Sequence, residues 1–267
     1  MDLPGALYLP TDDDHDGYRG YEATALTIGP WDPALQHAGP PAALLGRAVE
    51  RCEPRPDAQV GRITFEILGP VPLAPLRVSA RVVRPGRSVE LLEASLSGPD
   101  GEVMRASAWR LRTGAVELDP EPPADPPPPG PAAGTREPFF PVREEAGYHT
   151  AMEISFVSGG FLEPGPAMVW MRSRVPLVEG EDTSPLGRVL IAADAGNGVS
   201  AALDWRRYLF INTDLSVHLK RLPAGEWVGL DAVTYPEPHG IGLADTALWD
   251  ERGRLGRAAQ TLVVRSR

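Results

Sequence analysis

Apolar and polar residues alternate along several stretches of the chain, and this alternation predicts β-strands. The clearest stretch covers residues 60–68, where Ile63, Phe65 and Ile67 share one face and polar side chains fill the other. A period of two is typical of a strand with one buried face. Three similar stretches follow, at residues 76–83, 88–97 and 103–112, with glycine- and proline-rich turns between them. The first half of the chain therefore predicts four consecutive antiparallel strands.

A helix is expected before each set of strands. Pro40 and Pro41 suit the first turn of a helix, and five residues then follow at helical spacing: Leu44, Leu45, Ala48, Val49 and Cys52. In the second half we expect a helix at 197–208. The strands expected after it lie at 209–219, 226–235, 241–249 and 255–265. One more strand is expected before each helix, at 21–28 in the first half and at 167–175 with 189–193 in the second.

The two halves also share short sequences at similar offsets. Gly101-Glu-Val-Met-Arg-Ala resembles Gly253-Arg-Leu-Gly-Arg-Ala at an offset of 152 residues, and His37-Ala-Gly resembles Asp194-Ala-Gly at an offset of 157. Offsets this close indicate a duplication whose differences fall in loops. The fold class we expect is α+β, with two tandem repeats of a central helix wrapped by a curved antiparallel sheet.

A proline-rich stretch separates the repeats. Eight of the twelve residues from Pro120 to Pro131 are proline, which excludes a helix or a central strand and favours an extended conformation. We therefore interpret 114–147 as a linker. The predicted domains are an N-terminal one at 1–113 and a C-terminal one at 148–267.

Composition and charge exclude several classes of function. The net charge is −10 and the sequence shows no Lys/Arg cluster, which argues against nucleic-acid binding. No apolar run is long enough for a transmembrane helix, and the acidic N-terminus does not resemble a signal peptide. The single cysteine, Cys52, excludes an internal disulfide and a thiolate zinc site, so the cytoplasm is the expected compartment. His15 lies in an aspartate cluster, which we interpret as a solvated loop without a metal.

Two segments resemble the acyl-CoA thioesterase II family of double hot-dog enzymes. They are Trp31…His37-Ala-Gly-Pro-Pro-Ala-Ala-Leu-Leu, and the region from Ser184-Pro-Leu to the end of the chain. The resemblance implies a thioesterase that hydrolyses a fatty or related acyl-CoA without a cofactor, acting in fatty acid metabolism as a homo-oligomer. It also implies a water-activating set from the C-terminal repeat, and its members match Asp194, Thr213 and Gln260.

Thioester hydrolysis needs a base, a positioned water and donors for the developing oxyanion. In this interpretation Asp194 accepts the water's proton, while Gln260 and Thr213 hold the water. Alternation places Thr213 in the apolar row that faces the helix. Gly39 or Gly196 allows the substrate carbonyl to approach a helix N-terminus, and His37 contacts the coenzyme. At an offset of 152 residues Gln260 corresponds to Ala108, so the first half lacks the set and one site per chain is expected.

Several alternatives remain at this stage. Asp194 alone is typical of a helix N-cap. His37 and Asp194 could also form the acid–base pair of a double hot-dog dehydratase or hydratase. A protein of the same fold that binds acyl-CoA or an acyl carrier without catalysis is a third possibility. The segment 196–201 fits G-x-G-x-x-A, but the strands lack the alternating helices of a dinucleotide-binding fold. A serine hydrolase is disfavoured because no G-x-S-x-G sequence is present.

Overall fold

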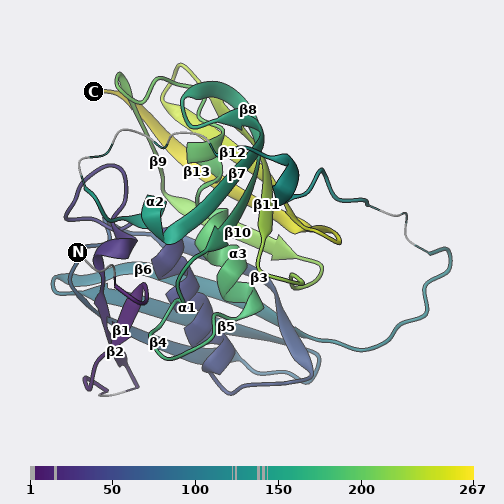
Figure 1. Ribbon diagram of the computed structural model, residues 1–267. Helices are drawn as coiled ribbons and strands as arrows, with labels where there is room; N and C mark the ends of the chain where they lie inside the picture. Colours follow the sequence, from purple (N-terminus) through teal and green to yellow (C-terminus); the bar gives the residue numbers. More distant parts are fainter. Residues whose placement is uncertain are drawn as a thin grey trace.

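The computed structural model describes residues 4–14, 17–121, 123, 125–136, 139, 142 and 144–267. His15 therefore lies outside the described residues, as do parts of the proline-rich segment. Within the described chain, thirteen strands form one antiparallel sheet in the order β1-β2-β4-β5-β6-β3-β10-β13-β12-β11-β8-β7, and β9 pairs with β13 beside β10. Figure 1 shows this strongly curved sheet with the helices inside its curve.

The first half of the chain forms the part of the sheet that surrounds helix α1. Its elements are β1 (Tyr8–Pro10), β2 (Arg19–Ala23), α1 (Gly39–Arg51), β3 (Ala58–Ile67), β4 (Pro75–Arg84), β5 (Val89–Gly98) and β6 (Gly101–Arg112). Ile63, Phe65 and Leu92 are fully buried on the inner face, and α1 packs against β4 and β5. The expected helix and the four strands after it are confirmed.

The second half repeats this arrangement with a different helix from the one expected. Its strands are β7 (Met152–Gly160), β8 (Glu163–Ser173), β9 (Tyr208–Asn212), β10 (Asp214–Leu219), β11 (Val228–Pro236), β12 (Ile241–Asp250) and β13 (Gly253–Ser266). Its helices are α2 (Tyr148–Ala151), α3 (Pro185–Ala193) and α4 (Gly196–Val199). Short 3₁₀ turns lie at Ala25–Thr27 and Pro131–Ala133.

The expected helix at 197–208 is therefore wrong, as is the expected strand at 189–193. The central helix is α3, whose N-cap Ser184 accepts a hydrogen bond from the Gly187 N–H, with Pro185 in the first turn. The short apolar run from Val189 was interpreted as a strand, and a run of this kind does not distinguish a strand from a buried helix. All of its residues are buried in the core.

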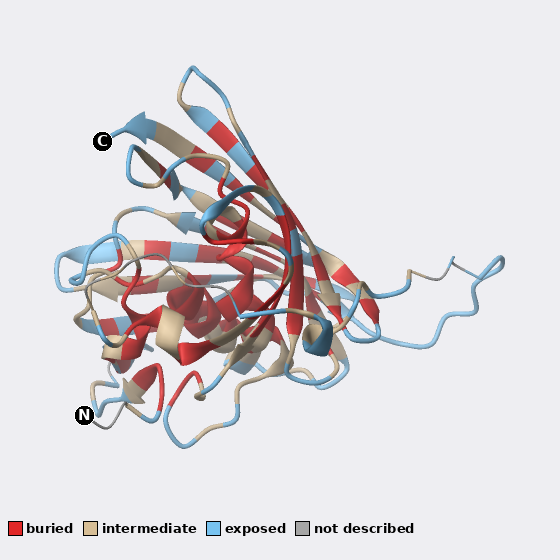
Figure 2. Ribbon diagram, turned by 45° about the horizontal axis from the view of Figure 1, so that its top comes forward, coloured by how far each residue is buried: buried red, intermediate tan, exposed pale blue. Residues whose placement is uncertain are grey.

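Strands β3 and β10 join the two halves into one sheet. Ser216 pairs with Thr64, and their hydroxyl oxygens lie 3.1 Å apart. These two residues are separated by 152 positions, the offset of the sequence repeat, so equivalent residues meet at this junction. The expected α+β architecture of two helix-and-sheet repeats is confirmed. Figure 2 shows the buried residues concentrated on the helices and on the inner side of the strands.

Helices α1 and α3 lie against each other at the centre of the molecule. A Cβ atom at Gly39 would come within 2.4 Å of the Ile191 carbonyl oxygen, and one at Gly46 within 2.3 Å of a Leu190 methyl group. The hydroxyl of Ser184 donates to the Glu50 carboxylate at 2.6 Å. The two helices therefore approach closely only because glycine occupies these positions.

The segment after β6 has no helix or strand among its described residues up to Gly130. Its later part lies on the second half of the sheet. The Trp170 indole N–H donates to the Pro129 carbonyl at 2.8 Å, the Ser155 hydroxyl donates to the Pro131 carbonyl, and Thr135 forms a bridge with Phe156. Across the described residues, no helix has the length and apolar character needed to cross a bilayer.

Candidate active site

A cavity of about 330 Å³ lies between the two halves of the molecule. The first half contributes the loop from Gly29 to Ala38 and the turn after β3, and the second half contributes Asp194 to Gly198 and the end of β9. Trp31 and Ile211 are partly exposed at its rim. Tyr148, Phe161 and Met171 are buried along its inner wall, and half-buried Phe139 from the linker lines the same wall.

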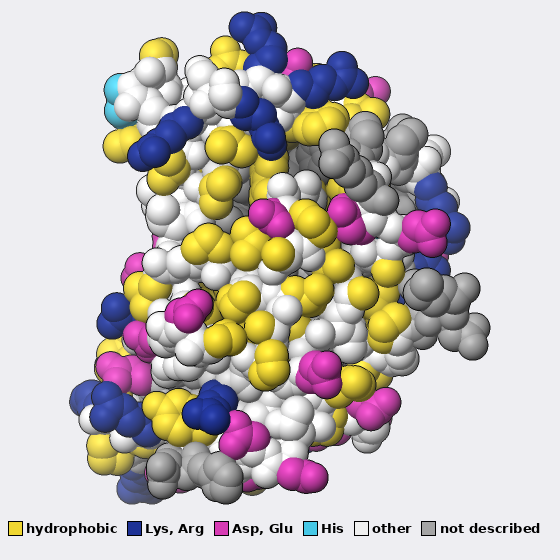
Figure 3. Space-filling view, turned by 90° about the vertical axis from the view of Figure 1, so that its left-hand side faces the viewer, with side chains coloured by type: hydrophobic (Ala, Val, Ile, Leu, Met, Phe, Trp, Pro, Cys, Tyr) yellow, Lys and Arg dark blue, Asp and Glu magenta, His cyan; other side chains and the backbone are white. Residues whose placement is uncertain are grey.

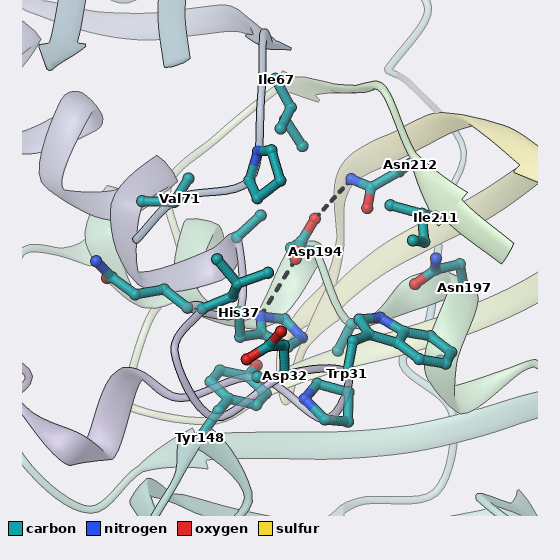
Figure 4. Close-up of a pocket in the computed structure, with 18 of the residues that line it drawn as sticks. Trp31, Asp32, His37, Ile67, Val71, Tyr148, Asp194, Asn197, Ile211 and Asn212 are labelled. Carbon is teal, nitrogen blue, oxygen red and sulfur yellow. Dashed lines mark hydrogen bonds and ion pairs between the residues drawn. The ribbon is translucent and has the colours of Figure 1, made fainter. Parts of the chain in front are cut away.

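Asp194 lies at the centre of this cavity, as Figure 4 shows. It is the C-cap residue of α3, so the alternative interpretation of Asp194 as a helix N-cap is wrong. Its side chain is buried, and its Oδ1 atom accepts hydrogen bonds from Asn212 Nδ2 at 2.9 Å and from Gln260 Nε2 at 3.2 Å. A buried carboxylate needs such partners. The other oxygen, Oδ2, faces His37.

Gln260 holds this segment in place through all of its amide groups. Its Nε2 donates to both the carbonyl and the carboxylate of Asp194, and its Oε1 accepts from the Asn197 N–H at 3.1 Å. The side chain is almost completely buried. Both donor hydrogens and the acceptor are thus engaged by the chain at the junction of α3 and α4.

Thr213 lines the cavity, but it does not occupy the inward-facing row expected from alternation. It is exposed, and its hydroxyl makes long contacts of 3.4 Å with Asp214 and with the Thr261 carbonyl. Among the described residues, no hydrogen bond joins Thr213 to Asp194. Asn212 points toward the carboxylate instead (Figure 4).

A β-bulge explains why Asn212, and not Thr213, points toward Asp194. On β13, Asn212 lies opposite Leu262 and Ser216 lies opposite Ala259, so four steps along one strand match three along the other. An extra residue in one strand reverses the alternation beyond it and redirects side chains, often beside active sites. A continuous strand at 209–219 was expected, and simple alternation across the bulge gave Thr213 the wrong face.

His37 is brought to Asp194 from the other half of the chain. Its Nδ1 atom lies 3.2 Å from Asp194 Oδ2 and accepts the Gly39 N–H at 3.1 Å. The imidazole stacks on Tyr148, with ring centres 3.8 Å apart, and the Tyr148 hydroxyl donates to the Ile191 carbonyl. Burial lowers the pKa of His37 from its ordinary value, and the negative charge of Asp194 opposes this effect.

The two glycines expected beside the substrate do not line the cavity. Gly39 packs against the Ile191 carbonyl, and a Cβ atom at Gly196 would lie 2.5 Å from the Thr246 hydroxyl. Ala38, the residue before Gly39, does line the cavity, and in the described chain its backbone N–H donates no hydrogen bond. This N–H, in the cavity that Asp194 also lines, is a donor that spacing alone did not indicate.

No group of three or more His, Cys, Asp or Glu side chains in the described residues is arranged to hold a metal ion.

Models of two protein domains match the sequence. The acyl-CoA thioesterase N-terminal domain matches residues 27–111, and the acyl-CoA thioesterase C-terminal domain matches residues 119–264. The chain belongs to the acyl-CoA thioesterase family. It is accordingly a thioester hydrolase, as the sequence predicted.

Solved structures share the fold of this thioesterase at low sequence identity. A proposed thioesterase II from Thermobifida fusca YX is 17% identical, with a TM-score of 0.75, covering 98% of this chain and 96% of that one. A hot-dog protein of unknown function from Alicyclobacillus acidocaldarius is 15% identical, with a TM-score of 0.74 and coverage of 97% and 96%.

An acyl-CoA thioesterase II from Mycobacterium marinum is 13% identical, with a TM-score of 0.66 and coverage of 97% and 95%. No curated protein sequence matches this thioesterase significantly. The structural matches therefore establish the hot-dog architecture, and the domain models establish the family.

Proposed function

We propose that Asp194 is the base that activates water for attack on the acyl-CoA thioester. The observation that carries this proposal is that the two carboxylate oxygens of Asp194 have different surroundings. Oδ1 is held by Asn212 and Gln260, whereas the described residues give Oδ2 one polar contact, with His37, and Asp194 lines the cavity. A carboxylate fixed at one oxygen has a defined acceptor position at the other, where a water can donate its proton.

Gln260 acts in this proposal as a positioning residue. Because its amide groups are all bonded to the chain, it orients the carboxylate of Asp194 and has no donor left for the water. Asn212 shares this task through its 2.9 Å hydrogen bond. The role of Thr213 in holding the water stays a prediction, supported by its position on the cavity wall.

The reaction then runs between the two halves of the chain. The water oxygen bonds to the thioester carbon while its proton passes to Asp194 Oδ2, where His37 Nδ1 lies close enough to share it. The carbonyl oxygen becomes an oxyanion, and the free Ala38 N–H is the donor we assign to it. Collapse breaks the carbon–sulfur bond, and the stored proton goes to the thiolate, releasing the acid and free coenzyme A.

Turnover of an acyl-CoA chain-length series, followed with a thiol-trapping dye, tests this mechanism. Asp194→Asn should keep the fold and lower kcat by about 10²- to 10⁴-fold, the usual contribution of a positioned base. Asp231→Asn is the matched control because Asp231 is exposed on β11, away from the cavity. Activity of Asp194→Asn equal to that of this control rules out Asp194 as the base.

The contact between His37 and Asp194 also keeps the hydratase alternative testable. Under the hydrolytic proposal, His37→Ala should lower thioester turnover less than Asp194→Asn does. Hydration of a 2-enoyl-CoA that depends equally on both residues would favour the acid–base pair instead. Binding of acyl-CoA without turnover across the whole series would favour a non-catalytic binding protein.

A further inference from the structure

Four exposed arginines gather beside the mouth of the cavity, although they are distant in sequence. They are Arg206, Arg207, Arg265 and Arg267, and we refer to them as the arginine corner. Arg206 and Arg207 precede β9, and pairing of β9 with β13 brings the C-terminal residues beside them. The Arg267 N–H donates to the Arg207 carbonyl at 3.0 Å. Figure 3 shows dark blue side chains along the upper edge of this face, the end where Figure 1 places the C-terminus.

The charges of the arginine corner are not neutralised by carboxylates. Among the described residues, none of its four side chains forms an ion pair, whereas several other arginines do, such as Arg172 with Glu153 and Arg221 with Asp250. The nearest acidic residue in sequence, Asp204, caps the Arg206 backbone N–H. In a chain of net charge −10, four unpaired positive charges at one corner attract an anionic ligand.

Aromatic rings accompany these charges. The guanidinium carbon of Arg267 lies 5.4 Å from the ring centre of Trp31, and that of Arg207 lies 5.6 Å from the ring centre of Tyr208. Trp31 also lines the cavity and contacts Phe210 edge to face. The arginine corner therefore adjoins the rim of the cavity directly, and it combines phosphate-binding groups with surfaces on which a purine base can stack.

The distance from the arginine corner to the Asp194 carboxylate matches the length of the pantetheine arm of coenzyme A. Asn212 contacts Asp194, and Arg207 lies five residues earlier on an extended path, which corresponds to about 16 Å at the usual rise of a strand. The pantetheine arm of coenzyme A has roughly thirteen bonds from sulfur to the first phosphorus, or about 15 Å at the dimensions of an extended peptide. A thioester at Asp194 thus places the phosphates at the arginine corner.

We propose that the arginine corner binds the diphosphate and 3′-phosphate of coenzyme A, with the adenine base against the neighbouring aromatic rings. This inference rests on the proposed function, because it places the thioester at Asp194. It selects coenzyme A over an acyl-carrier protein, since a carrier's acidic surface has no need of the rings beside the arginines. The sequence showed no Lys/Arg cluster because residues 206–207 and 265–267 meet only through strand pairing.

The test compares acyl-CoA with the matching acyl-pantetheine, which lacks the phosphates and the nucleotide. In the triple variant Arg207→Ala, Arg265→Ala, Arg267→Ala, the ratio of kcat/KM for acyl-CoA to that for acyl-pantetheine should fall about 10- to 100-fold. Its KM for acyl-CoA should also depend less on salt. The control variant changes Arg19, Arg87 and Arg252, exposed arginines elsewhere, to alanine. It loses the same charge and should keep the ratio within about twofold.

Calorimetric binding of adenosine 3′,5′-bisphosphate gives a readout that does not require turnover. It should weaken in the corner variant and not in the control. Equal ratios and equal binding in the two variants overturn the inference, as does a loss confined to acyl-carrier-protein substrates. Failure of the proposed function is a different result, in which the unmodified protein hydrolyses neither thioester.

Discussion

Asn212 offers the sharpest test of how the carboxylate is held. Asn212→Ala removes the 2.9 Å hydrogen bond to Asp194 Oδ1 and leaves Gln260 as the remaining side-chain donor to that atom. A hydrogen bond to a charged group contributes about 1.5–3 kcal/mol. At about 1.4 kcal/mol per tenfold change, kcat should fall roughly 10- to 150-fold. Thr213→Ala removes only contacts of 3.4 Å from an exposed hydroxyl, so its kcat should change less than about threefold.

The assay is steady-state hydrolysis of a saturating acyl-CoA, with thermal unfolding to verify that both variants are folded. The split between kcat and KM separates positioning from a purely structural role. Asn212 holds the carboxylate and not the substrate, so Asn212→Ala should lower kcat and leave the KM for acyl-CoA nearly unchanged. A large loss in Thr213→Ala together with near-normal Asn212→Ala would refute this reasoning and would favour Thr213 as the water-holding residue.

Three further predictions concern specificity, stability and pH. Phe139→Ala enlarges the cavity at its inner wall. The ratio of kcat/KM for a longer acyl-CoA to that for a shorter one should therefore rise about tenfold. An unchanged dependence of kcat/KM on chain length would contradict this. Glu90→Ala leaves the buried Arg110 guanidinium without its 2.7 Å partner. The free energy of unfolding measured in urea should therefore fall by about 3–5 kcal/mol. The exposed control Glu93→Ala should lower it by about 1 kcal/mol or less. Burial lowers the pKa of His37, so the folded state resists protonation and its free energy of unfolding should decrease as pH falls below about 6.5. His37→Asn should flatten that decrease, and parallel curves would contradict the assignment.

Periodicity predicted most of the sheet because each strand has one buried and one exposed face. The run at 60–68 is an example, since Ile63 and Phe65 are fully buried and its bounds differ from those of β3 by only one or two residues. The central helix of the second half could not be located in this way. Residues Val189 to Ala193 are buried all round, and a fully buried segment shows neither helical nor strand periodicity.

The candidate site was predicted in part. The resemblance to the thioesterase family singled out Asp194 and Gln260, and a hydrogen bond joins their side chains in the structure. Asn212 was missed because a single-residue bulge between β9 and β10 reverses the faces, and no residue type marks that bulge in the sequence. Tyr148 was missed because its stacking on His37 depends on the path of the chain after the linker.

The closeness of α1 and α3 limits how this enzyme can change over evolutionary time. The 3.2 Å between His37 and Asp194 depends on the absence of a single methyl group at Gly39, where Ile191 leaves no room for one. Replacement of Gly39 by alanine would push the backbones of α1 and α3 apart. The distance between His37 and Asp194 would then increase, although neither of these residues is changed. Attempts to broaden substrate range by mutagenesis should therefore leave this glycine unchanged and vary the rim and the inner wall.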